Sequence, residues 1–393
     1  MRKWQHLTIL TTCAIGVIVI MVVNLIDNLF ARERIDLSPY LLTKPKVLFS
    51  IPYGKGPSQV GIFIPHPKVE DAGEAAGPSD FEVGFDGSIY IGDEQNGKVK
   101  KFSRDGELLM MTEGRNDGIV SMTVDKQGRT YIIHGTLSNK VAVYDDKGKR
   151  LLEVEKKIEE AAARLAEHLK ANQPQLADEI FRWGGLPSGE VKCDGAGNLY
   201  FWCRGYIVKI DSQFTKAQIV KGYPLDEKDS YLYSFRYLPP EGEAKGLVYG
   251  VDGRLISQYP IGILRRVEII IYGADGLIVR RFILPQGEWS KVERLVPIGG
   301  GDIVCDGQGH FYTARSPVAA YHIPLRSDNP EFFVVHFDAV LEYNNKGSFV
   351  GVRAIINRFM RFTESFRVDK QGNVYWLDFK ADRLNVMMAP APQ

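Results

Sequence analysis

The chain has 393 residues, of which 45% are hydrophobic and 25% charged, a composition typical of a globular protein that buries a sizeable core. Its formal net charge of +1 gives no electrostatic basis for a nucleic acid as the main partner. The few cysteines lack the Cys-x-x-Cys spacing of a metal site: they are Cys13, Cys193, Cys203 and Cys305.

The N-terminus carries a long uncharged segment. Residues 7–23 contain no charged side chain, and residues 24–26 extend the stretch to about 20 residues, enough to cross a bilayer as a helix. Arg2 and Lys3 precede it, so the N-terminus is expected in the cytoplasm and the body outside it, in the periplasm or at the cell surface. A cleaved signal peptide is the alternative, with Ala31 before the cleavage point, but Leu29 is large where a small residue is preferred. The sequence predicts a membrane anchor at residues 1–30, contacting the membrane through residues 7–26, and a tether at residues 31–45.

The clearest strand signal lies between Pro78 and Leu109. Apolar and polar residues alternate from Phe81 to Phe85, and Asp86-Gly87 is a strong signal for a tight turn. The pattern predicts four short antiparallel strands, at residues 81–85, 88–92, 99–102 and 107–111. Such a sheet is the unit that propellers repeat around an axis.

The same pattern recurs along the chain. An apolar strand, a turn with Asp and Gly, and a second strand, usually with Tyr, appear six times, anchored at Gly84, Asp125, Asp194, Gly250, Asp306 and Asp369. A third-strand signature recurs in phase at residues 99–102, 141–144, 207–210, 269–272 and 340–343. The sequence therefore predicts an all-β fold, a six-bladed propeller of four-stranded blades over residues 46–388.

The last copy lacks a fourth strand, and residues 46–51 form a lone strand before the first copy. We expect residues 46–51 to close the ring by pairing with the last copy, which leaves only short edges. Residues 389–393 form a tail.

Apolar residues at helical spacing predict an amphipathic helix in an insertion at residues 153–183, packed on the propeller or docking a partner. Residues 316–338 are expected to form a long loop.

Residues 78–108 resemble an NHL repeat, the unit of six-bladed NHL-type propellers. The match includes Ile89-Tyr90, Asp93, Asn96, Val99 and Phe102, and weaker copies extend it over residues 46–388. The resemblance implies a six-bladed propeller. Propellers of this family include peptide-, protein- and RNA-binding modules and a few metal-dependent enzymes, so the resemblance leaves the function open.

The best candidate site lies four residues before each anchor position. These positions open the predicted inner strands and should surround one mouth of the central channel: Asp80, Ser121, Glu190, Gly246, Asp302 and Ser365. Asp80, Glu190 and Asp302 are acidic, and converging carboxylates could hold a divalent cation such as Ca²⁺. The alternative is a polar, water-filled channel mouth with Ser121 and Ser365 among its polar groups. No other cofactor is indicated.

Three functions follow as hypotheses. The first is a membrane-anchored, extracytoplasmic, non-enzymatic module that binds a protein or a small ligand, because the sequence has no phosphate loop or nucleophile elbow. The second is a metal-dependent hydrolase or lyase using Asp80, Glu190 and Asp302. The third is an accessory subunit of a larger membrane complex.

Overall fold

In the computed structural model, the strands among the described residues form six antiparallel sheets. Five sheets have four strands and one has three. The described residues are 41–63, 77–114, 118–135, 140–181, 190–203, 206–220, 231–237, 247–253, 266–272, 278–283, 303–306, 308–315, 334–359, 366–380 and 382–392.

We number the sheets in chain order. Sheet one contains β2 (Asp80–Val83), β3 (Ile89–Asp93), β4 (Lys98–Phe102) and β5 (Leu108–Met111), and sheet two contains β6 (Ile119–Val124), β7 (Thr130–His134) and β8 (Lys140–Tyr144). Sheet three contains β9 (Val191–Cys193), β10 (Leu199–Cys203), β11 (Tyr206–Ile210) and β12 (Ala217–Ile219). Sheet four contains β13 (Tyr231–Tyr237), β14 (Leu247–Gly253), β15 (Arg266–Tyr272) and β16 (Ile278–Ile283). Sheet five contains β17 (Ile303–Cys305), β18 (Phe311–Arg315), β19 (Val334–Tyr343) and β20 (Phe349–Phe359), and sheet six contains β21 (Arg367–Val368), β22 (Val374–Phe379), β23 (Arg383–Ala389) and β1 (Lys46–Pro52).

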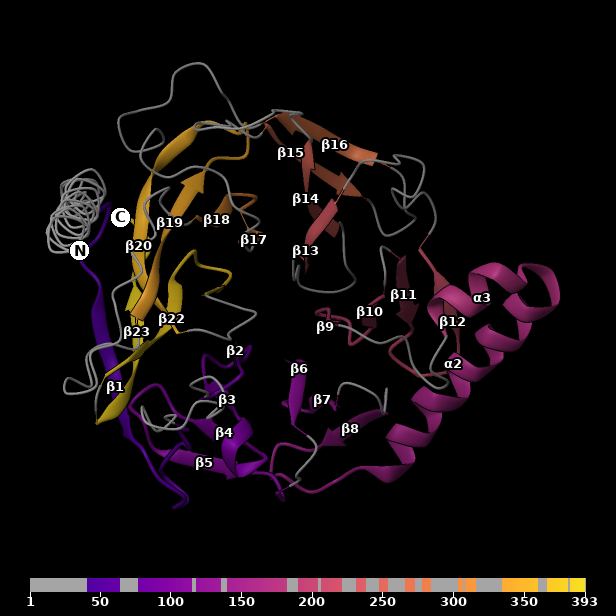
Figure 1. Cartoon of the computed structure of the whole chain (residues 1–393), viewed down its shortest axis with the longest axis horizontal. Helices are drawn as coiled ribbons and strands as arrows, with labels where there is room; N and C mark the ends of the chain where they lie inside the picture. The colour runs from indigo at the N-terminus through magenta and orange to yellow at the C-terminus, as the bar shows by residue number, and fades with distance from the viewer. Residues whose placement is uncertain are drawn as a thin grey trace, which may run out of the picture.

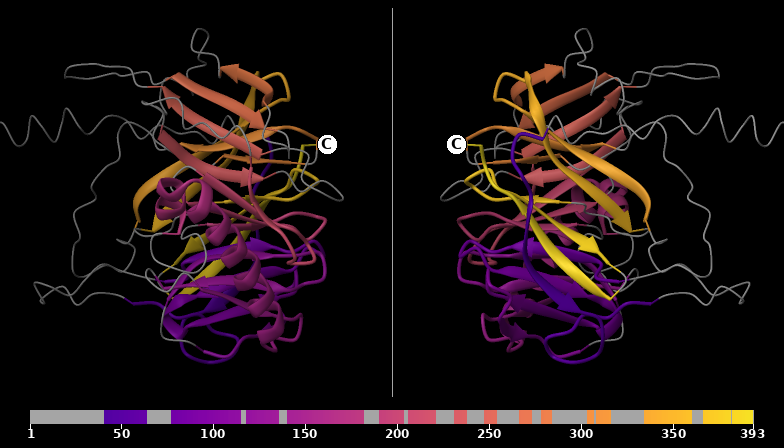
Figure 2. Two further views of the ribbon diagram at one scale, coloured as in Figure 1. Left: turned by 90° about the vertical axis from the view of Figure 1, so that its right-hand side faces the viewer. Right: turned by 90° about the vertical axis from the view of Figure 1, so that its left-hand side faces the viewer.

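The sheets stand side by side around a central axis, with the first strand of each sheet innermost (Figure 1). The inner strands β2, β6 and β9 contact one another in sequence, and β13, β17 and β21 do the same before β21 meets β2 again. The edge-on views show one ring of sheets with a helix along its outer side (Figure 2). This arrangement confirms the predicted all-β propeller with four-stranded blades.

The expectation that all six blades have four strands is wrong for sheet two, which has three. After Tyr144 the chain turns and makes one bridge, between Tyr144 and Arg150, before a helix begins at Leu152. The helix supplies a hydrogen-bond acceptor to the outer edge of β8, because the Val143 N–H donates to the Glu155 carboxylate over 3.0 Å. The insertion thus occupies the place of the fourth strand.

The helical insertion packs on the propeller. It consists of α2 (Leu152–Asn172) and α3 (Pro174–Ile180). The buried face of α2 joins one hydrophobic core with residues of sheets two and three, and includes Ile158, Ala162, Leu165 and Leu169. The predicted helix is therefore present, and its apolar face is covered by the propeller.

Replacing Ile158 with alanine should lower the free energy of unfolding by about 2–5 kcal/mol, because the side chain is fully buried between α2 and the sheets. Glu159→Ala, one residue along on the exposed face, should change it by less than about 0.5 kcal/mol. Chemical denaturation of both variants measures the difference. Equal losses in the two would show that α2 does not depend on this packing.

Closure of the ring joins the two ends of the described chain. β1 pairs antiparallel with β23, from Lys46 opposite Met388 to Pro52 opposite Arg383. This is the pairing expected for residues 46–51. Ser50 Oγ also donates a hydrogen bond of 2.7 Å to Asn385. Sheet six is completed by a strand from the start of the chain.

The segment after β1 is fixed on sheet one by a buried ion pair. Lys100 Nζ lies 2.8 Å from the Asp93 carboxylate, and both side chains are almost fully buried. Asp93 also accepts hydrogen bonds from the Gly61 N–H and from the Asn96 amide, at 2.8 and 2.7 Å. Asn96 Nδ2 in turn donates to the Gly54 carbonyl over 3.0 Å, so Asp93 and Asn96, which are part of the NHL resemblance, hold residues 54–61 in place.

Four inner hairpins are closed by the same contacts. In each, an aspartate accepts backbone N–H groups two and four residues later, and its second oxygen accepts a tyrosine hydroxyl six residues later, over 2.8–3.1 Å. The glycine that closes each turn has a φ of +79° to +85°, which favours glycine. The aspartates are therefore structural, and the pairs are Asp125–Tyr131, Asp194–Tyr200, Asp306–Tyr312 and Asp369–Tyr375.

Two expectations about the second half of the ring are corrected. Residues 247–253 form the second strand of sheet four, β14, and the inner strand is β13, so Gly250 is not an inner-strand anchor. The misassignment arose because Tyr249–Gly253 has the turn composition of an inner hairpin. In addition, the expected loop at residues 316–338 ends earlier, because β19 begins at Val334.

Among the described residues, no helix is long and apolar enough to span a membrane. The predicted anchor at residues 1–30 and most of the tether lie outside the described residues.

Candidate functional site

The candidate site is a network of charged side chains on the inner strands, close to the axis of the ring. Asp80 and Glu82 lie on β2, Lys192 lies on β9 and Arg367 lies on β21. These strands belong to sheets one, three and six. All four side chains are largely buried, so their charges act in a medium of low polarity.

Asp80 is held by partners on both neighbouring sheets. Its Oδ1 accepts a hydrogen bond of 2.6 Å from Arg367 on one side, and its Oδ2 accepts the Met122 N–H over 3.0 Å on the other. Oδ1 also accepts the Phe81 N–H over 2.7 Å. Both oxygens of this predicted site residue are therefore engaged by the protein itself.

Arg367 links Asp80 to Glu82. Its Nε lies 3.0 Å from Glu82 Oε2, and its guanidinium lies 4.9 Å from the centre of the Phe81 ring. The guanidinium thus joins β21 to β2 through two carboxylates and one aromatic face. A planar guanidinium that bridges two carboxylates and stacks on an aromatic ring is specific to arginine, and lysine cannot reproduce it.

Lys192 extends the network past sheet two. Its Nζ lies 3.8 Å from Glu82 Oε2, although β6 stands between β2 and β9 in the ring. Glu82 therefore contacts cations from two other sheets. This arrangement fixes the relative positions of three sheets near the axis.

The electrostatic environment of Asp80 contains opposing effects. Burial raises the pKa of the Asp80 carboxyl, and the nearby Glu82 carboxylate acts in the same direction. The Arg367 and Lys192 cations and the Met122 N–H oppose this rise in pKa. Removing either partner of the Asp80–Arg367 pair would leave the buried charge of the other with weaker compensation.

The other predicted site residues are placed only in part. Ser121 Oγ accepts the Val191 N–H over 3.2 Å, which joins β6 to β9. Glu190 is partly buried, and its Oε2 is a buried atom without a hydrogen-bond partner. Asp302, Ser365 and Gly246 lie outside the described residues. Convergence of Asp80, Glu190 and Asp302 on one cation therefore stays a prediction. Within the described part of the chain, no three His, Cys, Asp or Glu side chains form a group that could hold a metal ion.

The sequence reasoning missed Glu82, Lys192 and Arg367. The signal was present, because each of the three lies midway between a mouth position and its anchor position, two residues from both. Residues two apart on a strand point to the same side, so each of the three shares a side of its inner strand with the mouth position. Comparing the residues two positions before each anchor across the repeats would have grouped Glu82 with the cations Lys192 and Arg367.

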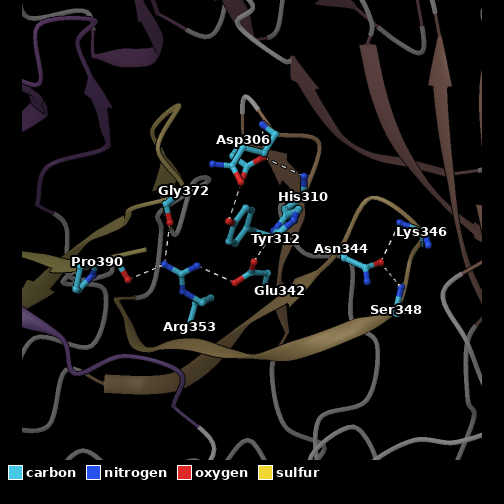
Figure 3. A network of polar contacts seen from close by, with 11 residues as sticks. Asp306, His310, Tyr312, Glu342, Asn344, Lys346, Ser348, Arg353, Gly372 and Pro390 are labelled. Carbon is cyan, nitrogen blue, oxygen red and sulfur yellow. Dashed lines mark hydrogen bonds and ion pairs between the residues drawn. The ribbon is translucent and has the colours of Figure 1, made fainter. Parts of the chain in front are cut away.

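A second buried network joins sheets five and six (Figure 3). Arg353 on β20 donates hydrogen bonds to Glu342 over 2.7 Å, to the Gly372 carbonyl over 2.8 Å and to the Pro390 carbonyl over 2.9 Å. The other Glu342 oxygen lies 2.6 Å from His310 Nδ1. Arg353 is fully buried, and its guanidinium also lies over the Tyr312 ring at 5.6 Å.

Arg353 takes a place that lysine holds in two other sheets. Lys101 pairs with Tyr90 across strands β3 and β4, and Lys209 pairs with Tyr200 in the same way, each with its ammonium over the tyrosine ring. At the equivalent position in sheet five, Tyr312 pairs with Glu342. In sheet five the cation over the tyrosine ring therefore comes from Arg353 on the fourth strand, β20. From this position Arg353 also contacts the Gly372 and Pro390 carbonyls of sheet six.

These features define the chain as an all-β propeller. No protein-family model matches it, so the resemblance to NHL repeats stays a prediction. No curated protein matches it either.

Solved structures resemble it distantly. Hydrazine synthase from Kuenenia stuttgartiensis has 14% identity and a TM-score of 0.42, with 77% of this chain and 76% of that chain covered. Virginiamycin B lyase from Staphylococcus aureus has 12% identity and a TM-score of 0.41, with 79% and 94% covered. A gluconolactonase from Xanthomonas campestris has 13% identity and a TM-score of 0.41, with 88% and 98% covered. Similarities at this level carry no argument about function.

Proposed function

We propose that the chain is a membrane-anchored, extracytoplasmic propeller that binds another protein or a small ligand and has no catalytic activity of its own. The observation that supports this is the engagement of the charged groups near the axis with one another. Asp80 has partners on both of its oxygens, and Glu82 contacts both Arg367 and Lys192. Carboxylates held in this way stabilise the ring and are poorly placed to act on a substrate.

The membrane part of the proposal is supported by the uncharged run at residues 7–26 and by Arg2 and Lys3 before it. A rigid ring on a short tether presents two faces and an outer rim to partners at the membrane surface. A partner would then be held by these surfaces, and the chain would act as a scaffold or receptor for it.

Extraction from the native membrane tests this function. The full chain is solubilised in a mild detergent, purified and analysed by native mass spectrometry. We expect a second component in fixed ratio to the chain, a protein or a small molecule, which remains bound in the presence of a chelator. A bare chain would contradict the binding function, and a large assembly with several other membrane proteins would favour the accessory-subunit alternative.

A second candidate, a hydrolase or lyase dependent on a divalent cation, is favoured by one observation. The buried Glu190 Oε2 has no hydrogen-bond partner, and a cation held with Asp80 and Asp302 would supply one. Calorimetric titration of the chain with Ca²⁺ tests it. Binding that is abolished by Glu190→Gln and retained in Glu113→Gln, on the exposed Glu113, would support the metal site. Absence of binding in the unaltered chain would exclude it.

A further inference from the structure

The chain leaves the propeller at a fixed place on its outer rim. The Leu42 N–H donates to the Val352 carbonyl of β20 over 2.9 Å, and Leu41 forms a parallel bridge with Val352. Thr43 Oγ1 donates to the Pro390 carbonyl over 2.9 Å, and this carbonyl also accepts from Arg353. Residues 41–43 are therefore attached to sheets five and six before the chain continues into β1.

The distance from this place to the proposed anchor is short. Residues 27–40 separate the uncharged run from Leu41. As a flexible chain this segment spans about 20 Å on average, and about 50 Å when fully extended. If residues 7–26 lie in the bilayer, this link keeps the rim near Leu41 within about 50 Å of the membrane.

This rim carries exposed apolar and basic side chains. Leu42, Val47 and Val350 are 36%, 48% and 39% exposed. Lys44 and Lys46 are exposed beside them, and Lys346 is exposed in the turn that leads into β20. We call these six residues the exit surface. The exposed acid Asp382 directly precedes β23 and lies next to Arg383, which pairs with Pro52 at the opposite end of β1 from Lys46.

We propose that the exit surface rests on an anionic lipid bilayer, and the proposal depends on the membrane anchor of the proposed function. The apolar side chains enter the headgroup region, and the lysines lie against phosphate groups. Apolar residues flanked by lysine are the chemistry that membrane surfaces attract. The contact orients the propeller, with the exit surface toward the membrane and α2 on the opposite side of the ring (Figure 1).

Fluorescence quenching by labelled lipids tests the orientation. The full chain is reconstituted in vesicles of phosphatidylcholine with about 30% phosphatidylglycerol, an anionic lipid, and a headgroup-linked quencher. A fluorophore is attached at Val350→Cys or, as the matched control, at Leu152→Cys, where the side chain is 62% exposed at the start of α2. The unaltered chain, labelled in the same way, gives the background of the native cysteines.

The fluorophore at Val350→Cys should be quenched at least about twofold more than that at Leu152→Cys, because a side chain that enters the headgroup region lies beside the quencher, whereas α2 lies on the opposite side of the ring. Reversing Lys44, Lys46 and Lys346 to glutamate should reduce this difference, whereas reversing Lys156, Lys157 and Lys170 on α2 should leave it unchanged. Equal quenching at the two positions, or stronger quenching at Leu152→Cys, would overturn the orientation. Flotation of the same vesicles separates the two proposals, because a chain that does not float contradicts the anchor itself.

Discussion

Replacing Asp80 with alanine is expected to lower the free energy of unfolding by about 3–5 kcal/mol, among the largest effects of any single change in the described structure. The substitution leaves the buried Arg367 guanidinium with Glu82 as its remaining carboxylate in the network. It also removes the acceptor of the Met122 N–H, which links sheet one to sheet two. Chemical denaturation followed by tryptophan fluorescence measures the loss.

Two further variants make this result specific. Asp382→Ala removes a carboxylate that is 70% exposed beside Arg383, and exposed pairs of this kind contribute less than about 1 kcal/mol. Combining Asp80→Asn with Arg367→Met removes both charges at once. The loss of stability in the double variant should therefore be smaller than the sum of the losses in the two single variants. A loss below about 1 kcal/mol for Asp80→Ala would show that the pair does not hold the ring.

Replacing Arg353 with methionine should cost a similar amount, about 3–5 kcal/mol, because it removes the arginine cation from the buried Glu342 carboxylate and leaves His310 as its remaining side-chain partner. The Gly372 and Pro390 carbonyls lose a donor in the same step, so the contact between sheets five and six is weakened. Arg383→Met, at a position 51% exposed, is the matched control. Denaturation midpoints of the two variants give the comparison.

The chain also supplies a rescue for Arg353→Met. Adding Glu342→Lys places a lysine opposite Tyr312, the arrangement that Lys101 has with Tyr90 and Lys209 has with Tyr200. The double variant should recover part of the lost stability, because the cation over the tyrosine ring is restored without a buried carboxylate. No recovery would show that Arg353 matters for its contacts with sheet six alone.

Much of the fold was predictable because each sheet repeats the same local chemistry. The aspartate, glycine and tyrosine of the inner hairpin are spaced by contacts within one turn, so they recur in the sequence at fixed intervals. Sheet four shows the limit of this reasoning. Tyr249–Gly253 has the same composition, yet it lies within the second strand, because pairing with β13 and β15 decides its place.

The charged contacts between sheets were harder to predict. Asp80 was recognised as an inner-strand residue, but its partners come from elsewhere: Arg367 follows 287 positions later. The pair of Arg353 and Glu342 depends on the register of β19 and β20, which shifts near Val340 and Glu342. Sequence spacing does not specify such irregular pairing.

Closure of sheet six by β1 has a consequence for how the chain folds. Ser50 and Asn385 are 335 positions apart, and Thr43 and Pro390 are 347 apart, so these contacts form only after the whole ring has been synthesised. The entropy of joining such distant segments costs roughly 3 kcal/mol more than closing a loop of about ten residues. Until β23 emerges from the ribosome, β1 lacks the strand with which it pairs. We therefore expect the ribosome-bound chain to carry this exposed strand throughout synthesis, and an unpaired strand edge favours aggregation until its partner is present.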